Sequence, residues 1–223
     1  MNIIVLIPAY NEARTIGSLI VALRKKNLPV VVVDDGSQDH TNVYSTDAGA
    51  FVLRHEKNKG KGHSLKTGFG YALMQGFDGV IIMDGDGQHD AADIDQFLNF
   101  PELSRAVVIN GNRMDKAHNM PAVRYITNRF MSAMISFVCK QSVPDTQCGF
   151  RFIGADVLKE LRLTSGDFEI ETEILIKASK KGFKIYSVPI QTIYGEEKSR
   201  IHPVKDTVRF IIYIIKEIFF HKD

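Results

Sequence analysis

Short apolar runs alternate with amphipathic stretches along most of the chain. The runs at 2–7, 30–34, 51–54, 79–83 and 106–110 have the apolar, β-branched content of buried strands. Between the first two, residues 13–26 place Ile16, Leu19, Ile20 and Leu23 on one face of a predicted helix. Further helices are predicted at 41–48, 63–75 and 91–100. Strands that alternate with helices in this way predict an α/β fold with a mostly parallel sheet flanked by helices.

The second half of the chain continues this pattern less regularly. Helices are predicted from Pro121 to about Cys139, at 155–161 and at 169–181, and strands at 150–153 and 183–188. Asp90 is expected to cap the helix that follows it. Since no repeat or low-complexity linker interrupts these elements, we expect one domain over residues 1–203.

The last segment, residues 204–223, has a different pattern. Its apolar residues fall on one broad helical face, and its basic residues Lys205, Arg209 and Lys216 line another. Such an amphipathic helix either lies in a membrane interface or packs on the domain.

Composition and charge exclude several classes of protein. A chain of 223 residues with 44% hydrophobic and 24% charged residues is an ordinary globular protein, and its net charge of +2 gives no sign of a nucleic-acid partner. Two cysteines form neither a disulfide framework nor a metal-ligand spacing. No apolar run reaches the roughly 18 residues of a transmembrane helix, and the N-terminal run is too short for a signal peptide. We therefore expect a cytoplasmic protein.

The segment MDGDGQHD, residues 83–90, carries the strongest chemical signal. Asp84 and Asp86 follow a predicted buried strand, in a turn made flexible by glycines. In a parallel sheet ligands bind beyond the carboxyl ends of the strands, where Tyr10 and Asp35 would also lie. Two close carboxylates suit Mg²⁺ or Mn²⁺, which prefer oxygen ligands and are often shared with substrate phosphates. The alternative is a solvated acidic turn.

Five motifs in order along the chain resemble the inverting family 2 glycosyltransferases, and within them the polyprenyl-phosphate branch related to dolichol-phosphate mannosyltransferase. They are IPAYNE (7–12), VVDDGSQDHT (32–41), NKGKGHSLKTGF (58–69), MDGDGQHD (83–90) and DTQCGFRF (145–152). The resemblance spans nearly the whole chain and implies a GT-A-type, Rossmann-like domain.

The resemblance also implies a nucleotide-sugar donor and a divalent cation. Asp35 matches the acid that contacts the base, and Lys198 and Arg200 match a basic loop that closes over the donor phosphates. The implied donor pocket comprises Pro8, Ala9, Tyr10, Glu12, Asp35, Asp84 and Lys198. The implied metal ligands are Asp84, Asp86 and Gln88.

On the acceptor side the resemblance points to arginines. Arg113 matches an arginine that faces the acceptor or the diphosphate, and the implied catalytic set is Asp86, Arg113 and Arg200. Arginine pairs bidentately with phosphate oxygens, as a lipid-phosphate acceptor would require. Weaker acceptor-side candidates are Arg124, Gln147, Arg151 and Glu169. For Gln147 and Arg151 the alternative is a hydrogen-bonded turn that braces a strand, and for Glu169 a helix-dipole partner.

The expected reaction is transfer of a sugar from a GDP- or UDP-sugar to a polyprenyl phosphate, with inversion. The expected partners also include a membrane, contacted peripherally on its cytoplasmic face, or a membrane subunit. One rival is a family 2 transferase that acts on a saccharide hydroxyl, which would need a general base. The other is a non-catalytic nucleotide-sugar-binding protein attached to a membrane through its last helix.

Overall fold

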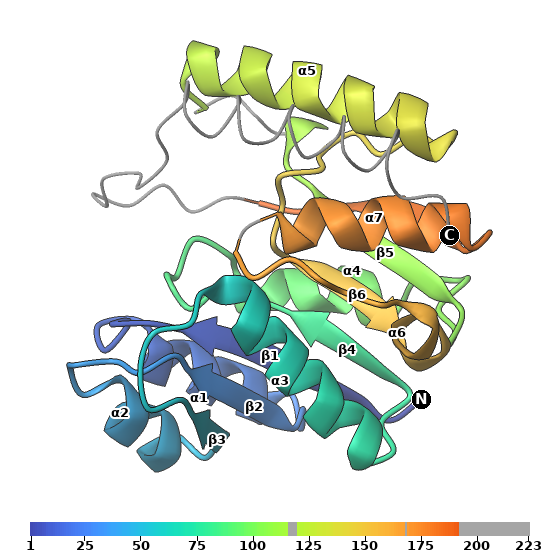
Figure 1. The fold of residues 1–223 in the computed structure, drawn as a ribbon. Helices are drawn as coiled ribbons and strands as arrows, with labels where there is room; N and C mark the ends of the chain where they lie inside the picture. Colours follow the sequence, from blue (N-terminus) through green and yellow to red (C-terminus); the bar gives the residue numbers. More distant parts are fainter. Residues whose placement is uncertain (116–119, 168, 192–223) are drawn as a thin grey trace.

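The computed structural model describes residues 1–115, 120–167 and 169–191, and confirms the alternation of strands and helices (Figure 1). The strands are β1 (Ile3–Ala9), β2 (Val30–Asp34), β3 (Phe51–Arg54), β4 (Gly79–Ile82), β5 (Val107–Asn112), β6 (Arg151–Gly154) and β7 (Lys184–Pro189). The helices are α1 (Ile16–Lys25), α2 (Thr41–Asp47), α3 (Lys61–Met74), α4 (Ile94–Leu98), α5 (Ala122–Cys139), α6 (Ala155–Glu160) and α7 (Ile170–Lys180), with a 3₁₀ turn η1 (Ala91–Asp93).

The strands form one seven-stranded sheet in the order β3-β2-β1-β4-β6-β5-β7. All neighbours are parallel except β6, which runs antiparallel to both β4 and β5. The reversal brings the beginning of β6 to the edge at which β4 ends, since Arg151 pairs with Ile82. The segment that precedes β6 therefore lies beside the loop that follows β4.

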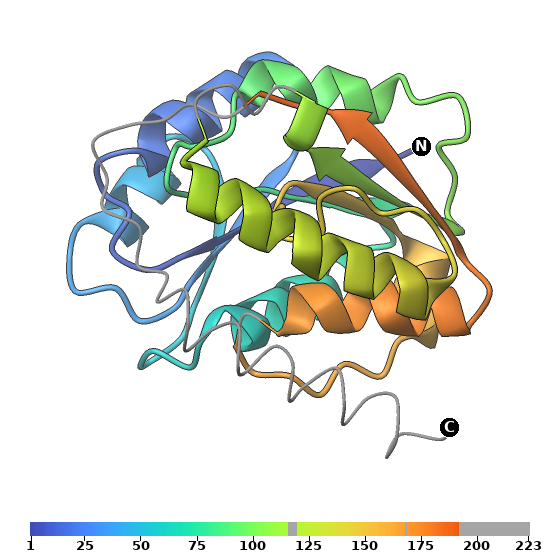
Figure 2. The ribbon, with the colours of Figure 1, turned by 90° about the horizontal axis from the view of Figure 1, so that it is seen from above.

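Two apolar layers cover the two faces of the sheet. The first contains Leu65 of α3, Ile135 of α5 and Ile174 of α7, and the second contains Ile20 of α1 and Phe97 of α4. Figure 2 shows this division, with α1 and α4 along one side of the sheet and α3 and α7 along the other. The sheet is thus buried on both faces, as the continuous apolar runs of β1 and β2 predict.

Most predicted boundaries hold within two residues. The predicted helix at 91–100 is instead a 3₁₀ turn followed by the short α4, and Asp90 Oδ1 caps it by accepting from the amide of Ala92 at 2.8 Å. The third helix begins at Lys61, two residues earlier than predicted, because Gly60 adopts a φ of +97° that lets the chain turn directly into it.

The predicted C-terminal helix at 204–223 lies outside the described residues. Within the ranges that the structure describes, no helix has the length and apolar content needed to cross a bilayer.

Candidate active site

The loops after β1, β2 and β4 meet at one edge of the sheet, as their strand positions predict. Ala9 and Asp34 are register partners, and the amide of Asp35 donates to the carbonyl of Ala9 at 2.8 Å. The loop after β1 is tied to the loop after β2, because the amide of Asn11 donates to Ser37 Oγ at 3.0 Å and the amide of Glu12 to Thr41 Oγ1 at 2.8 Å. Three loops far apart in sequence thus form one wall of the site.

Asp84 lies in an ion-paired cluster that the sequence did not reveal. Lys61 Nζ lies 2.5 Å from Asp84 Oδ1 and 2.6 Å from Glu171 Oε1. Lys61 comes from the first turn of α3 and Glu171 from the first turn of α7. Asp84 still exposes 26% of its side chain, so it remains accessible to a ligand.

The cluster sets the charge on each of its members. Burial acts to raise the pKa of Asp84, but Lys61 and His89 outweigh burial and hold that pKa below its ordinary value. Burial acts to lower the pKa of Lys61, and the carboxylates of Asp84 and Glu171 raise it overall. Asp84 is therefore a carboxylate and Lys61 an ammonium at neutral pH.

Asp86 has the opposite environment. Burial and then the negative charge of Asp84 raise the pKa of Asp86 above its ordinary value. One of its oxygens accepts from the backbone amide of Gln88 at 2.9 Å. Gln88 therefore contacts Asp86 through its backbone amide, and the expected role of its side chain as a metal ligand stays a prediction. A second negative charge beside Asp84 is incompletely compensated, and a cation would compensate it.

A divalent cation fits this edge by the chemistry of its donors. The protein offers the two oxygen ligands that Mg²⁺ and Mn²⁺ commonly take from proteins. Buried His89 lies with its Nε2 3.8 Å from Asp84, and its Nδ1 has no hydrogen-bond partner. Across the described ranges no group of three or more His, Cys, Asp or Glu could hold a metal. The remaining ligands would come from donor phosphates and water.

Gly149 lets the segment before β6 approach Asp84. A Cβ built on Gly149 would lie 2.3 Å from Asp84 Oδ2. No side chain fits there without displacing the carboxylate, so the glycine of DTQCGFRF is a requirement of the site.

Asp35 is buried and already fully hydrogen-bonded. Its carboxylate accepts from the amides of Lys59, at 3.0 and 3.1 Å, and Gly60, at 2.8 Å, and His55 Nδ1 lies 2.6 Å from Oδ1. In the structure Asp35 anchors the loop before α3, which delivers Lys61. Contact with a nucleotide base, the role expected from the sequence, stays a prediction.

The other expected donor-pocket residues lie nearby. Pro8 and Ala9 belong to the end of β1, and Tyr10 is half-buried in the loop that follows. Lys198 and Arg200 lie outside the described residues.

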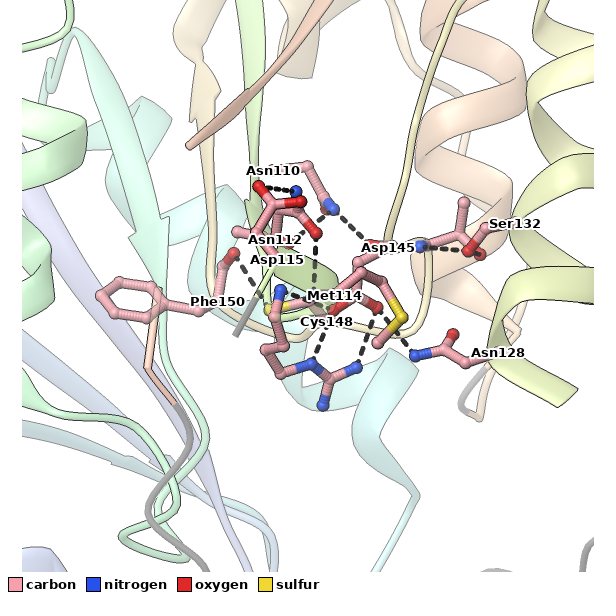
Figure 3. Close-up of polar contacts among 12 residues, drawn as sticks. Asn110, Asn112, Met114, Asp115, Asn128, Ser132, Asp145, Cys148 and Phe150 are labelled. Atoms are coloured by element: carbon pink, nitrogen blue, oxygen red, sulfur yellow. Dashed lines mark hydrogen bonds and ion pairs between the residues drawn. The ribbon is translucent and has the colours of Figure 1, made fainter. Parts of the chain in front are cut away.

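Arg113 is held by the buried carboxylate of Asp145, which is labelled in Figure 3. Its Nε donates to Asp145 Oδ2 at 2.7 Å, its Nη2 to Asp145 Oδ1 at 2.9 Å, and its amide to Oδ2 at 3.0 Å. Asn128 of α5 adds a donor to Asp145 Oδ1 at 3.1 Å. Burial acts to lower the pKa of Arg113, but nearby negative charge, including Asp145 and Glu171, raises it. Asp145 thus fixes the orientation of the guanidinium, and Glu171, the ion-pair partner of Lys61, lies near enough to act on its pKa.

Arg151 makes the contacts of a structural brace. It is 1% exposed, its Nε donates to Asn110 Oδ1 at 2.7 Å, and its Nη1 donates to the carbonyl of Glu171 at 2.7 Å. These contacts tie β6 to β5 and to the start of α7. Arg151 thereby positions Glu171, and its acceptor-side role, expected from the sequence, stays a prediction.

Within the described residues, the remaining acceptor-side candidates form no hydrogen bond or ion pair with the cluster at Asp84, so their roles stay predictions. Gln147 and Arg124 are half-buried, and Glu169 is the residue before α7. The sequence pointed to Glu169, whereas the structure places its neighbour Glu171 against Lys61. The sequence also places Glu171 in the first turn of this helix. Only the position of α7 relative to α3 shows that Glu171, and not Glu169, contacts Lys61.

The sequence profile of the family described as Glycosyl transferase family 2 matches residues 4–162. An uncharacterized protein of Methanocaldococcus jannaschii is 36% identical over 202 residues, covering 87% of this chain and 83% of that protein. The UDP-N-acetylglucosamine–dolichyl-phosphate N-acetylglucosaminyltransferase of Methanococcus voltae is 30% identical over 217 residues, covering 87% and 86%.

A crystal structure shares the fold. Glucosyl-3-phosphoglycerate synthase from Mycobacterium tuberculosis, in complex with Mn²⁺, UDP and phosphoglyceric acid, superposes with a TM-score of 0.77 at 18% identity. The match covers 100% of this chain and 80% of that one. It confirms the expected mostly parallel sheet flanked by helices.

Proposed function

Because the chain belongs to glycosyl transferase family 2 and is a glycosyltransferase, we propose that it transfers a sugar from a nucleotide sugar to a polyprenyl phosphate. The proposal includes inversion at the anomeric carbon and a divalent cation at Asp84 and Asp86. The Methanococcus voltae relative, named for a dolichyl-phosphate acceptor, supports the acceptor class.

At the donor end, Asp84 and Asp86 would hold the cation. When bound, the cation stabilises the negative charge that builds on the leaving nucleoside diphosphate. Lys61 lies beside Asp84 and supplies a second positive charge that can turn toward a phosphate oxygen. The ties between the loops after β1 and β2 hold the nucleotide side of the pocket in place before the donor arrives.

At the acceptor end, Arg113 binds the attacking phosphate. Asp145 and Asn128 hold the guanidinium in one orientation, so little side-chain entropy is lost when it pairs with phosphate oxygens. A phosphate is already ionised near neutrality and needs no strong general base. A single in-line displacement would then invert the configuration.

The observation that carries this proposal is the guanidinium of Arg113, which Asp145 holds in one orientation. Burial acts to lower its pKa, but negative charge that includes Glu171, the ion-pair partner of Lys61, raises it. Asp145 engages Nε and Nη2 of this guanidinium, so an anionic acceptor would have to pair with its remaining N–H groups. A hydroxyl acceptor would instead need a base within hydrogen-bond reach.

The direct test is incubation of the full chain with polyprenyl phosphate, Mg²⁺ or Mn²⁺ and a panel of labelled UDP- and GDP-sugars. We expect label from at least one donor in the organic phase, with opposite anomeric configurations in donor and product by NMR. Asp84→Asn should abolish transfer, while Asp95→Asn, at an exposed carboxylate, should leave it unchanged. Absence of transfer from every donor would refute the proposal.

Arg113→Lys separates the two acceptor classes. Lysine keeps a charge for Asp145 but loses the planar fork, so transfer to polyprenyl phosphate should fall by roughly a hundredfold, about 2.7 kcal/mol in transition-state stabilisation. The saccharide transferase would be favoured by a different result. The unsubstituted protein would then transfer sugar faster to saccharide hydroxyls than to polyprenyl phosphate, and Arg113→Lys would leave the transfer to saccharides unchanged.

A further inference from the structure

One face of α5 exposes large apolar side chains along its whole length. Val123, Ile126, Phe130, Ala133 and Phe137, here called the α5 stripe, are spaced by three and four residues and so share a face. Their four large side chains are 68%, 67%, 55% and 85% exposed, in chain order. The opposite face, with Met131 and Ile135, is buried in the core. The helix is thus apolar on two sides and uses only one for folding.

The stripe stands out from the rest of the described surface. The other exposed large apolar side chains are scattered over several elements, and Phe51 among them stacks on Tyr71 at 4.8 Å. These others are Met1, Val21, Val43, Tyr44, Phe51 and Met74. A continuous apolar row on one helix is typical of a binding surface, whereas single exposed residues are ordinary.

The charge around the stripe indicates what binds there. Between Ala122 and Lys140 the sequence contains Arg124, Arg129 and Lys140 and no Asp or Glu. Arg129 and Lys140 are exposed. Two copies of this helix packed together would bring like charges close, which is unfavourable. An apolar row on a helix whose own charged side chains are all basic is complementary to an anionic lipid surface.

The position of α5 connects this surface to the acceptor site. Its inner face carries Asn128, which donates to the carboxylate that holds Arg113. A helix is about 10 Å across, so lipid headgroups at the stripe would lie roughly one helix width from that buried network. In Figure 1, α5 forms the upper edge of the molecule, with α7 beneath it.

We propose that the α5 stripe is the surface through which this enzyme rests on an anionic membrane, which brings a membrane-borne acceptor phosphate toward Arg113. The delivery of an acceptor phosphate rests on the proposed function, but membrane binding by the α5 stripe can be measured without any sugar transfer. It assigns to α5 a role separate from that of the segment at 204–223.

The first test places an environment-sensitive fluorophore on the stripe of the full-length protein. Phe130→Cys is labelled, and Met74→Cys, at an exposed site on α3, is the matched control; Cys139 and Cys148 are buried and free. Vesicles of phosphatidylcholine with phosphatidylglycerol should shift the probe at position 130 to the blue and shield it from an aqueous quencher. The probe at position 74 should not respond.

Two results would overturn the proposal. One is no response at position 130 to anionic vesicles. The other is a probe that is already shielded without vesicles, because a second copy or the chain's own C-terminal segment would then cover the stripe; dependence on protein concentration distinguishes those two occupants.

The second test removes the stripe. Ile126→Ser, Phe130→Ser and Phe137→Ser together should weaken binding to anionic vesicles at least about tenfold, since each apolar side chain that leaves water contributes up to that factor. Val43→Ser with Met74→Ser should have no such effect. Arg129→Gln with Lys140→Gln should weaken binding about fivefold per charge for anionic vesicles and not for neutral ones. Binding that survives the triple substitution would refute the proposal.

Activity separates this inference from the proposed function. With a water-soluble short isoprenyl phosphate the triple variant should transfer sugar normally, and with vesicle-borne polyprenyl phosphate it should lose at least tenfold. If the unsubstituted enzyme used neither acceptor, the proposed function would fail while the vesicle-binding result would still stand. Equal loss with both acceptors would instead show that the stripe supports the catalytic domain and not membrane contact.

Discussion

The carboxylate of Asp84 already has a cationic partner, the ammonium of Lys61. A divalent cation that binds Asp84 would compete with this ammonium. Lys61 is 14% exposed and lies between Asp84 and Glu171. A buried ammonium between two carboxylates offsets part of their negative charge in the apo site. Binding of a divalent cation to Asp84 would therefore require Lys61 to give up part of this contact.

Substitution of Lys61 by methionine tests that competition. Without the ammonium, Asp84 Oδ1 is available, so Mn²⁺ alone should bind about tenfold more tightly, equivalent to about 1.4 kcal/mol. Titration calorimetry or the electron paramagnetic resonance of free Mn²⁺ measures this. Lys59→Met, in the same loop, is the control and should leave the affinity unchanged. Weaker Mn²⁺ binding by the Lys61 variant would show that the lysine supports the metal site.

The raised pKa of Asp86 predicts how the stability of the protein depends on pH. Its folded pKa is raised above the ordinary value of 3.8, so its contribution to stability is present at acid pH and is lost as pH rises through the folded pKa. Asp86→Asn should therefore melt at a higher temperature than the unsubstituted protein at pH 7, and the difference should shrink as pH falls through that range. The variant should also lose Mn²⁺ binding. A lower melting temperature at pH 7 would contradict this assignment.

At the scale of elements, α7 and α3 are joined through a loop held by one buried acid. Glu173 of α7 accepts from Thr164 at 2.8 Å and from the amide of Ser165 at 2.9 Å, and it pairs with Lys177 at 2.8 Å. The same loop meets the start of α3, where the carbonyl of Gly166 accepts from the amide of His63 at 3.2 Å. Glu173 therefore helps to bring the helix starts that carry Glu171 and Lys61 together.

Glu173→Gln should destabilise the fold by about 3 kcal/mol, because it removes one partner of a buried ion pair. Urea unfolding followed by circular dichroism measures the loss. Glu160→Gln is the matched control, since the pair of Glu160 with Lys181 at 3.9 Å is exposed and should contribute less than about 1 kcal/mol. Similar losses in the two variants would show that the Glu173 cluster is no stronger than a surface pair.

At the scale of the whole molecule, the proposed metal site would need its ligand to be complete. The protein supplies two carboxylates at one sheet edge, and the rest of a cation's ligands would come from a nucleoside diphosphate. Cation and nucleotide should therefore stabilise the fold more together than the sum of their separate effects, by linkage.

Melting curves with UDP or GDP, with and without Mn²⁺, test this completion. At a hundredfold excess over Kd the matching pair should add about 2.7 kcal/mol, which corresponds to a rise of roughly 5–10 °C for a protein of this size. Asp84→Asn should abolish the joint effect. Strictly additive shifts would mean that nucleotide and metal bind at separate places.

The sequence by itself determined the elements, the fold class and the motif at Asp84 and Asp86. The spacing of hydrophobic residues is a local property of the sequence, so it predicts the elements. The loops that follow parallel strands lie at the same edge of the sheet whatever their sequences are. For this reason the grouping of Tyr10, Asp35 and Asp84 followed from position alone.

Only the tertiary structure decided which charged residues meet. The antiparallel course of β6 brings Gly149 against Asp84 and buries Arg151 as a brace, and the packing of α7 beside α3 joins Glu171 to Lys61. The fork of Arg113 on Asp145 likewise spans 32 residues of sequence. Such pairings depend on distances through space, which no spacing along the chain specifies.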